Sequence, residues 1–332
     1  KHIHASTVTS LLGKALSGEL IKLQTELGAQ YSYRESTNLF DLFSHKKRRI
    51  NNHEKIHATA EKSGKTLSEL HQVEEDVLTT NCADELIIQV DGGHIKSTQD
   101  DERSFEAMTA TIYKPSAVIP NSKDTRNHIE SKHCAASAKL DSQVQMKRRT
   151  IVAALKQGLT PETKVTALCD GASNCWNIID SLEPLAALVD RILDWFHLAM
   201  KIQNISLPTL IKPKLTRIKW HLWRGNVDRA LQRLTELAPL CSDKAADKLK
   251  KLSTYIKNNE DKIVNYRERQ KKGLTFTSNI AESTVESLIN QRCKGQQHMR
   301  WSREGLDPIL QIRAAIASDD WRKNWKTIVA SN

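Results

Sequence analysis

The chain has 332 residues, of which 39% are hydrophobic and 27% are charged. This is the composition of a soluble globular protein long enough to bury a core, and it excludes a disordered chain. Every apolar stretch is shorter than the ~18 residues that a membrane helix needs, so we expect no membrane partner. The chain starts without Met and without a signal-peptide core, so we expect a cytoplasmic protein that lacks its natural start.

The positive charge is concentrated in one part of the chain. Lys and Arg number 50 against 39 Asp and Glu, which gives a net charge of +11. The net charge is +1 over residues 1–80, −3 over 81–200 and +13 over 201–332. A basic surface beside an acidic pocket is typical of polyanion binding around a cation site, whereas lysine-rich solvated helices are the alternative. The six cysteines form no Cys-x-x-Cys pair, so no zinc finger is predicted.

The first 80 residues have the pattern of a helical region. Residues 5–29 have apolar side chains at helical spacing, which predicts a helix, and Gly28 is expected to end it. Residues 31–78 predict several short helices, and Gly64 is expected to break one of them. A basic run lies between these helices and consists of Lys46, Lys47, Arg48 and Arg49. A helix-turn-helix-like DNA-binding region is one interpretation, and an ordinary helical bundle is the other.

From residue 85 the pattern changes to short β-rich runs that alternate with helices. Strands are predicted at 85–90, 105–113, 132–139 and 164–169. Helices are predicted at 141–158 and 173–182, and a further helix is predicted to continue from the DWFH segment (194–197) to about residue 205. This alternation indicates an α/β domain with a mostly parallel or mixed sheet. Residues 208–274 have no strand pattern and carry 17 basic and 7 acidic residues, which predicts a basic helical insertion. Two further helices are expected at 280–293 and 304–318.

Two carboxylates follow buried strands directly. Asp91 and Asp170 each end a strand and precede a glycine. The carboxyl ends of such strands are where α/β sheets place ligands, and two neighbouring carboxylates repel unless a cation lies between them. This pattern predicts an Mg²⁺ site, with plain Asp-Gly turns as the alternative. Glu282 and Glu286 are spaced to share one helix face and offer a third carboxylate, unless that face is merely solvated.

Four motifs in order carry a resemblance to a known family. They are DGGHIK (91–96), LCDGASNCW (168–176), ILDWFH (192–197) and TVESLINQRCKGQQHMRW (284–301). Over residues 30–320 the chain resembles bacterial insertion-sequence transposases of the Mutator-like DDE type. The spacing also matches, with 79 residues from Asp91 to Asp170 and 116 from there to Glu286. The long second gap is where this group carries a helical insertion. One departure is the loop before Trp301, which lacks a glycine that relatives often have beside the Met.

The resemblance implies an RNase H-like fold, with a mixed five-stranded sheet flanked by helices. The catalytic domain would span 81–204 and 276–320, the all-α insertion 205–275 and the N-terminal helical region 1–80. The family pattern makes Asp91, Asp170 and Glu286 the catalytic and metal-binding triad, with Glu282 as the fallback. The expected cofactor is Mg²⁺, as two ions for which Mn²⁺ can substitute.

The resemblance also assigns supporting residues and partners. Asp194 and His197 match the group's Asp-x-x-His motif, and we expect them to contact DNA near the scissile phosphate or to brace the site. A motif after the Glu is matched by Arg292, Lys294, Arg300 and Trp301, and we expect these residues to bind DNA or to support the triad helix. The basic run at 46–49 is also expected to bind DNA. The implied partners are double-stranded DNA, as transposon terminal repeats and target, and further subunits in a dimer or larger assembly at the bacterial nucleoid.

The implied reaction is cleavage of transposon ends followed by transfer of the 3′-hydroxyl into target DNA. A nuclease or resolvase of the same fold that cuts without joining is one alternative, and a DNA-binding relative that has lost catalysis is the other. A zinc hydrolase is disfavoured because the histidines lack the spacing of a metal-binding helix.

Overall fold

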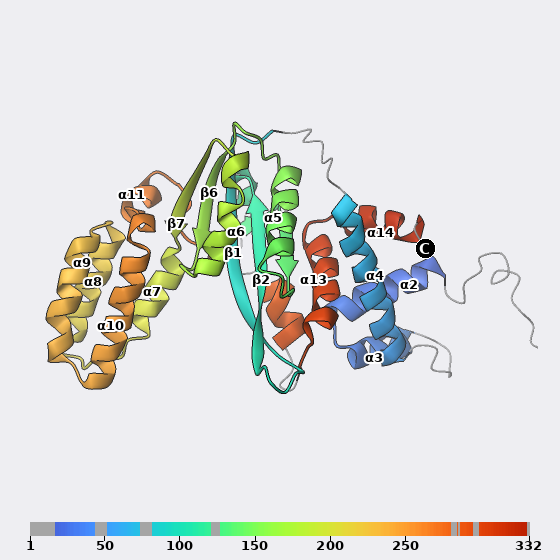
Figure 1. Cartoon of the computed structure of the whole chain (residues 1–332), viewed down its shortest axis with the longest axis horizontal. Coiled ribbons are helices and arrows are strands. Elements are labelled where there is room, and N and C mark those ends of the chain that lie inside the picture. The colour runs from blue at the N-terminus through green and yellow to red at the C-terminus, as the bar shows by residue number, and fades with distance from the viewer. Residues whose placement is uncertain are drawn as a thin grey trace, which may run out of the picture.

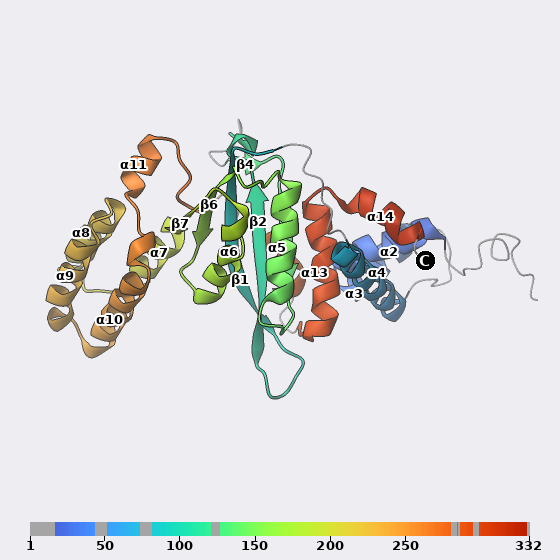
Figure 2. The same ribbon diagram turned by 45° about the horizontal axis from the view of Figure 1, so that its top comes forward.

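A computed structural model describes residues 17–43, 52–73, 82–120, 127–279, 284, 286–294 and 299–330. Its centre is a five-stranded mixed sheet flanked by helices, which confirms the predicted α/β class (Figure 1). Helical groups lie at both ends of the molecule, and Figure 2 shows the same arrangement after a rotation. The basic run Lys46–Arg49 and Glu282 lie outside the described residues. Within the described part, no helix combines the length and apolarity needed to cross a membrane.

The sheet has the strand order β5-β2-β1-β6-β7. Its strands are β1 (Glu85–Lys96), β2 (Ser104–Tyr113), β5 (His133–Ser137), β6 (Lys164–Cys169) and β7 (Leu188–Leu193). β2 is antiparallel to both β1 and β5, whereas β6 and β7 run parallel to β1. A separate two-stranded sheet pairs β3 (Val118–Ile119) with β4 (His128–Ile129). Short 3₁₀ helices are η1 (Pro115–Ala117), η2 (Glu183–Leu185), η3 (Ala238–Leu240) and η4 (Glu260–Lys262).

The first strand is longer than predicted. The sequence places its end before Asp91, but β1 continues through the two glycines to Lys96. The reason is tertiary, because β2 pairs with β1 as far as Lys96, whereas β6 stops pairing at Val90. Beyond Val90 the strand therefore leaves the parallel part of the sheet and continues as an antiparallel ribbon.

The two faces of the sheet are covered by different helices. Ile88 and Val90 point to the face that α5 (Val144–Lys156) and α6 (Ser173–Asp180) cover. Ile87, one residue out of phase, packs with α7 (Trp195–Gln203) on the opposite face. Because side chains alternate along a strand, Asp91 lies on the same face as Ile87.

All of residues 208–274 are described, and this insertion consists of helices joined by turns, with no strand. It contains α8 (Lys212–Trp223), α9 (Val227–Leu237), α10 (Asp243–Asn258) and α11 (Tyr266–Lys271). Its buried residues, among them Leu215, Leu234 and Leu249, belong to the same core as Ile87 of β1. The insertion therefore packs against the sheet and has no separate core.

Helices from both ends of the chain form the other end of the molecule. α2 (Gly18–Gln30) and α4 (His53–Val73) lie against α13 (Arg303–Ala317), α4 also contacts α14 (Trp321–Ala330), and α3 (Tyr33–Phe43) packs on α2 and α4 (Figure 1). Gly64 was expected to break a helix but lies inside α4, where a Cβ would collide with the backbone carbonyl of Pro308. Glycine thus permits close packing of α4 on α13. The sequence did not predict α14.

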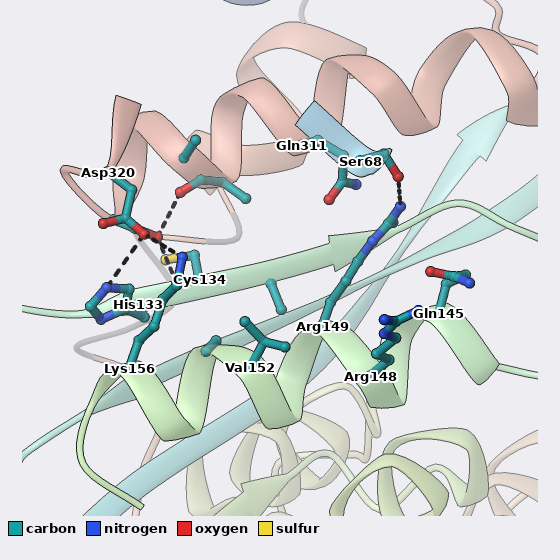
Figure 3. A pocket seen from close by; sticks show the side chains of 15 residues that line it. Ser68, His133, Cys134, Gln145, Arg148, Arg149, Val152, Lys156, Gln311 and Asp320 are labelled. Carbon is teal, nitrogen blue, oxygen red and sulfur yellow. Dashed lines mark hydrogen bonds and ion pairs between the residues drawn. The ribbon is translucent and has the colours of Figure 1, made fainter. Parts of the chain in front are cut away.

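Side chains cap the outer edge of β5. The Ser318 Oγ accepts a hydrogen bond from the amide of Cys134 at 2.9 Å, and Asp307 accepts one from Ala138 at 3.1 Å. Arg149 of α5 donates to the carbonyl of Ala136 at 2.9 Å and binds Asp307 through both terminal nitrogens, at 2.7 and 2.9 Å. Figure 3 shows Arg149 also reaching the Ser68 hydroxyl on α4. An edge strand covered in this way is protected against pairing with another chain.

Candidate functional site

In three neighbouring strands, an aspartate stands directly after the last residue that pairs in parallel. The last paired residues are Val90 and Cys169 between β1 and β6, and Cys169 and Leu193 between β6 and β7. Residues in register on parallel strands lie side by side, so the next residues form a row at the carboxyl edge of the sheet. That row consists of Asp91, Asp170 and Asp194. The aspartates line a cleft of about 360 Å³ together with Gln89, Val90, Thr111, Leu168, Cys169, His197 and Ser278.

Asp91 and Asp170 are the half-buried pair in this row. The amide of Gly92 donates to Asp91 Oδ1 at 2.8 Å, and the amide of Ala172 donates to Asp170 Oδ1 at 2.9 Å. Burial raises the pKa of Asp91, and the charge of Asp170 raises it further, although His197 opposes both effects. The two carboxylates are therefore close enough to repel each other.

Asp194 is turned into the protein. It is 1% exposed and caps the N-terminus of α7, where its carboxylate accepts from the amide of Phe196 at 3.2 Å. Ser278 donates to the same carboxylate through its amide at 2.8 Å and its hydroxyl at 2.7 Å. Burial alone would raise the pKa of Asp194, but the hydrogen bonds from His197 and Ser278 outweigh it and lower the pKa. Asp194 thus stays ionised.

His197 is the basic partner of these carboxylates. Its Nδ1 lies 2.6 Å from Asp194 Oδ2. Burial would lower the pKa of His197, but the hydrogen bond and charge of Asp194, with the charges of Asp91 and Asp170, raise it above its ordinary value. The ring is held by Asp194 and electrostatically coupled to the other two aspartates. This pair brings together the two residues of the predicted Asp-x-x-His motif.

Residues of the insertion, and of the segment after it, hold the ends of these strands. Tyr255 of α10 donates to the carbonyl of Asp170 at 2.6 Å, and Tyr266 of α11 donates to the carbonyl of Leu193 at 2.8 Å. Gly171 has a φ of +91°, and a Cβ there would lie 2.9 Å from the Tyr255 ring, so only glycine suits this turn. Sequence reasoning missed Tyr255, Tyr266 and Ser278, because no local pattern marks a side chain that contacts a distant strand.

Glu286 is not in the cleft. It is the exposed first residue of the π-helix η5 (Glu286–Lys294), and its Oε2 accepts from the Asn290 side chain at 2.6 Å. η5 nevertheless packs on β1 near the site, since a Cβ on Gly93 would lie 3.2 Å from Ile289. Among the residues that the structure describes, no three His, Cys, Asp or Glu side chains are grouped closely enough to hold a metal ion. Of the three predicted carboxylates, the structure places Asp91 and Asp170 in one cleft and Glu286 outside it, and the triad remains a prediction.

Two of the expected DNA contacts are enclosed by protein. Arg292 is 2% exposed, donates to the carbonyl of Gly28 at 3.1 Å and lies 4.8 Å from the ring centroids of both Tyr33 and Trp301. Trp301 is buried, and its amide donates to the carbonyl of Lys96 at 3.0 Å. Cation–π contacts therefore hold both side chains where η5, β1 and α2 meet, and their contact with DNA, like their support of the helix that carries Glu286, remains a prediction.

The other residues expected to bind DNA are not buried or lie outside the described residues. Lys294 and Arg300 are both exposed, and their DNA binding remains a prediction. The basic run at 46–49 also remains one, since it lies outside the described residues.

The fold and site define a mixed α/β protein with an acidic cleft at the carboxyl edge of its parallel strands. The chain belongs to the uncharacterised protein family UPF0236, whose family model matches residues 29–327. This match spans the sheet, the insertion and the helices α3, α4 and α13, together with most of α14, but begins at the end of α2. No curated protein matches the chain.

Proposed function

We propose that the chain is a DDE transposase with an RNase H-like fold, which cleaves transposon ends and transfers the 3′-hydroxyl into target DNA. The observation that carries the proposal is the placement of Asp91 and Asp170 side by side, directly after the last parallel pair of β1 and β6. The strand arrangement supports the proposal. Counted along the chain, Asp91 lies on the first strand of the five-stranded sheet, β1, and Asp170 follows the fourth, β6. This is where the resemblance places the first two carboxylates.

The donor set in the cleft fits divalent cations. The hydrogen bonds described for Asp91 and Asp170 use one oxygen of each carboxylate. Carboxylate oxygens are the ligands that Mg²⁺ prefers, and a cation would relieve the repulsion that raises the pKa of Asp91. Asp91 and Asp170 would hold the ions, and Glu286 would join them if η5 shifts on β1. Bound ions of this kind lower the pKa of the attacking hydroxyl and stabilise the leaving oxygen.

The chain's own residues hold and orient the DNA around this centre. The His197 cation attracts the scissile phosphate, and Asp194 fixes its ring. In the first step, water attacks phosphorus, a new P–O bond forms and the bond to the 3′-oxygen breaks. In the second step, the freed 3′-hydroxyl attacks a target phosphodiester and displaces its 3′-oxygen. The number of phosphodiester bonds is conserved in the joining step.

Removal of one carboxylate tests the proposal. In Asp170→Asn, nicking and joining of a labelled duplex carrying the element's ends should fall by about 10³-fold or more in Mg²⁺. Duplex affinity should stay within about threefold, because phosphate contacts lie elsewhere. Asp101→Asn, on an exposed loop, is the matched control and should retain full activity.

The possible outcomes separate the alternatives. Joining that persists in Asp170→Asn contradicts the proposed site. Wild-type chain that nicks without joining supports the nuclease or resolvase, and wild-type chain that binds DNA without Mg²⁺- or Mn²⁺-dependent cleavage supports the inactive relative.

A further inference from the structure

One side of the outermost two insertion helices is covered by cations. We call this side the α8–α9 face, and it consists of the exposed residues Lys214, Arg217, Arg224, Arg229 and Arg233. The opposite sides of the same helices are buried in the core through Leu215, Ile218 and Leu234. The face is therefore oriented by packing, and its cations point away from the sheet.

The cations of the two helices converge. Lys214, Arg217 and Arg233 line one hollow between α8 and α9, together with Glu236. His221 lies among them, and burial followed by the charges of Arg229, Arg233 and Arg224 lowers its pKa. Glu236 pairs with Arg233 at 2.8 Å, so it offsets one of the five cations. A net positive field remains across both helices.

An exposed tryptophan lies within this face. Trp220 is 54% exposed and is spaced three and four residues from Arg217 and Arg224, so the three share one stripe of α8. The Trp220 indole offers an apolar surface beside guanidinium groups that can bind phosphate. This combination suits a polyanion with apolar sugar edges, such as a nucleic acid.

The insertion holds this face in a fixed relation to the cleft. The hydroxyls of Tyr255 and Tyr266 bind the backbone of the strand ends at Asp170 and Leu193. α8 and α9 lie at the opposite end of the molecule from α2–α4 (Figures 1 and 2). A duplex bound to the face would therefore be held by a helical subdomain that shares one core and is hydrogen-bonded, through α10 and α11, to the strand ends beside the cleft.

We propose that the α8–α9 face is a docking surface for the phosphate backbone of duplex DNA, away from the scissile bond. The inference rests on the proposed function and specifies where that DNA is held. Contacts of this type position a duplex without reading its sequence. They also release counterions, so the affinity depends steeply on salt.

The test measures duplex binding by the full chain without divalent ions. The triple variant Arg217→Gln/Arg224→Gln/Arg229→Gln should bind a fluorescein-labelled duplex of arbitrary sequence at least about tenfold more weakly near 0.1 M salt, measured by anisotropy. The slope of log affinity against log salt should shrink by about 2 to 3. The control Lys244→Gln/Lys251→Gln/Lys257→Gln removes the same charge from exposed positions of α10 and should change affinity less than about threefold. Circular dichroism verifies that both variants fold.

The outcomes decide the proposal. Unchanged affinity in the α8–α9 variant, or equal losses in both variants, overturns a specific docking face. Tighter binding of the wild-type chain to phosphatidylglycerol vesicles than to the duplex, lost in the same variant, overturns DNA in favour of a membrane surface. Because no cleavage occurs in this assay, Asp170→Asn should bind like the wild type. Failure of the catalytic proposal is thereby separated from failure of the docking face.

Discussion

Buried charges are balanced at one edge of the sheet and left unbalanced at another. Beside β5, Asp307 is matched by Arg149 through two hydrogen bonds at 2.7 and 2.9 Å. Asp320 is likewise met by Lys156 at 3.2 Å and His133 at 3.5 Å, as Figure 3 shows. Where β1, β6 and β7 stop pairing in parallel, three aspartates line a cleft in which His197 is the one basic side chain among the described lining residues.

The comparison indicates that the edge beside β5 stabilises the fold, whereas the cleft has the features of a ligand site. Beside β5, Asp307 and Asp320 each face a cation, and the pKa of Asp320 is lowered to about 2, where hydrogen bonding to His133 and the charge of Lys156 outweigh burial. In the cleft, burial and Asp170 instead raise the pKa of Asp91. A fold that retains such repulsion loses stability unless a ligand relieves it, which is typical of functional sites.

The largest effect is expected where the balanced edge is broken. Arg149→Met leaves Asp307, which is 3% exposed, without its cation, and should lower the free energy of unfolding by about 3–5 kcal/mol in urea denaturation. The double variant Arg149→Met/Asp307→Leu removes both charges and should recover most of that loss. The exposed pair Lys65–Glu61, at 2.6 Å, is the control, and Lys65→Met should cost less than about 1 kcal/mol. Equal losses at both pairs would show that the β5 edge is not specially dependent on its ion pair.

Much of this architecture was predictable from local patterns. β6 occupies the predicted residues 164–169, and the Asp-Gly pairs at Asp91 and Asp170 mark the point where β1 and β6 stop pairing in parallel. Asp194 follows an apolar run in the same way, although the resemblance, and not this pattern, singled it out. Local hydrophobic periodicity and strand-end chemistry suffice for these features because they depend on neighbours in sequence.

The remaining features depend on contacts between distant residues. Arg292 is buried because it donates to Gly28, 264 positions away, so its basic character alone suggested a surface contact. Gly64 is of a residue type that often ends helices, but here it lies inside α4 and allows α4 to pack closely on Pro308. Tyr255 reaches Asp170 across 85 residues of chain. No single-sequence pattern encodes such pairings.

An intermediate effect is expected at the Asp194–His197 pair. The raised pKa of His197 contributes stability that is fully present below its unfolded value near pH 6.5 and is lost as the pH rises through the folded pKa. The lowered pKa of Asp194 contributes stability that is lost as the pH falls below about 4. In metal-free protein, His197→Gln should therefore cost about 1.5–3 kcal/mol near pH 5.5 and less near pH 9. Urea denaturation across this range measures the difference.

The control for that pair is a histidine on the surface. His57 lies 3.6 Å from Glu61 and is half exposed, so His57→Gln should change the free energy of unfolding by less than about 1 kcal/mol at either pH. A loss in His197→Gln that is the same at both pH values would show that the side chain contributes through packing and not through its charge.

The smallest effect tests the unbalanced cleft itself and has the opposite sign. Because the pKa of Asp91 is raised on folding, its ionised form opposes folding at every pH above that folded pKa. Asp91→Asn keeps an oxygen for the Gly92 amide and removes the charge, so it should stabilise metal-free protein by about 1 kcal/mol at pH 8 and have little effect near pH 3. Urea denaturation with Asp101→Asn as an exposed control measures this gain. Destabilisation at pH 8 would mean that His197 already neutralises Asp91, and that the cleft needs no added cation to be balanced.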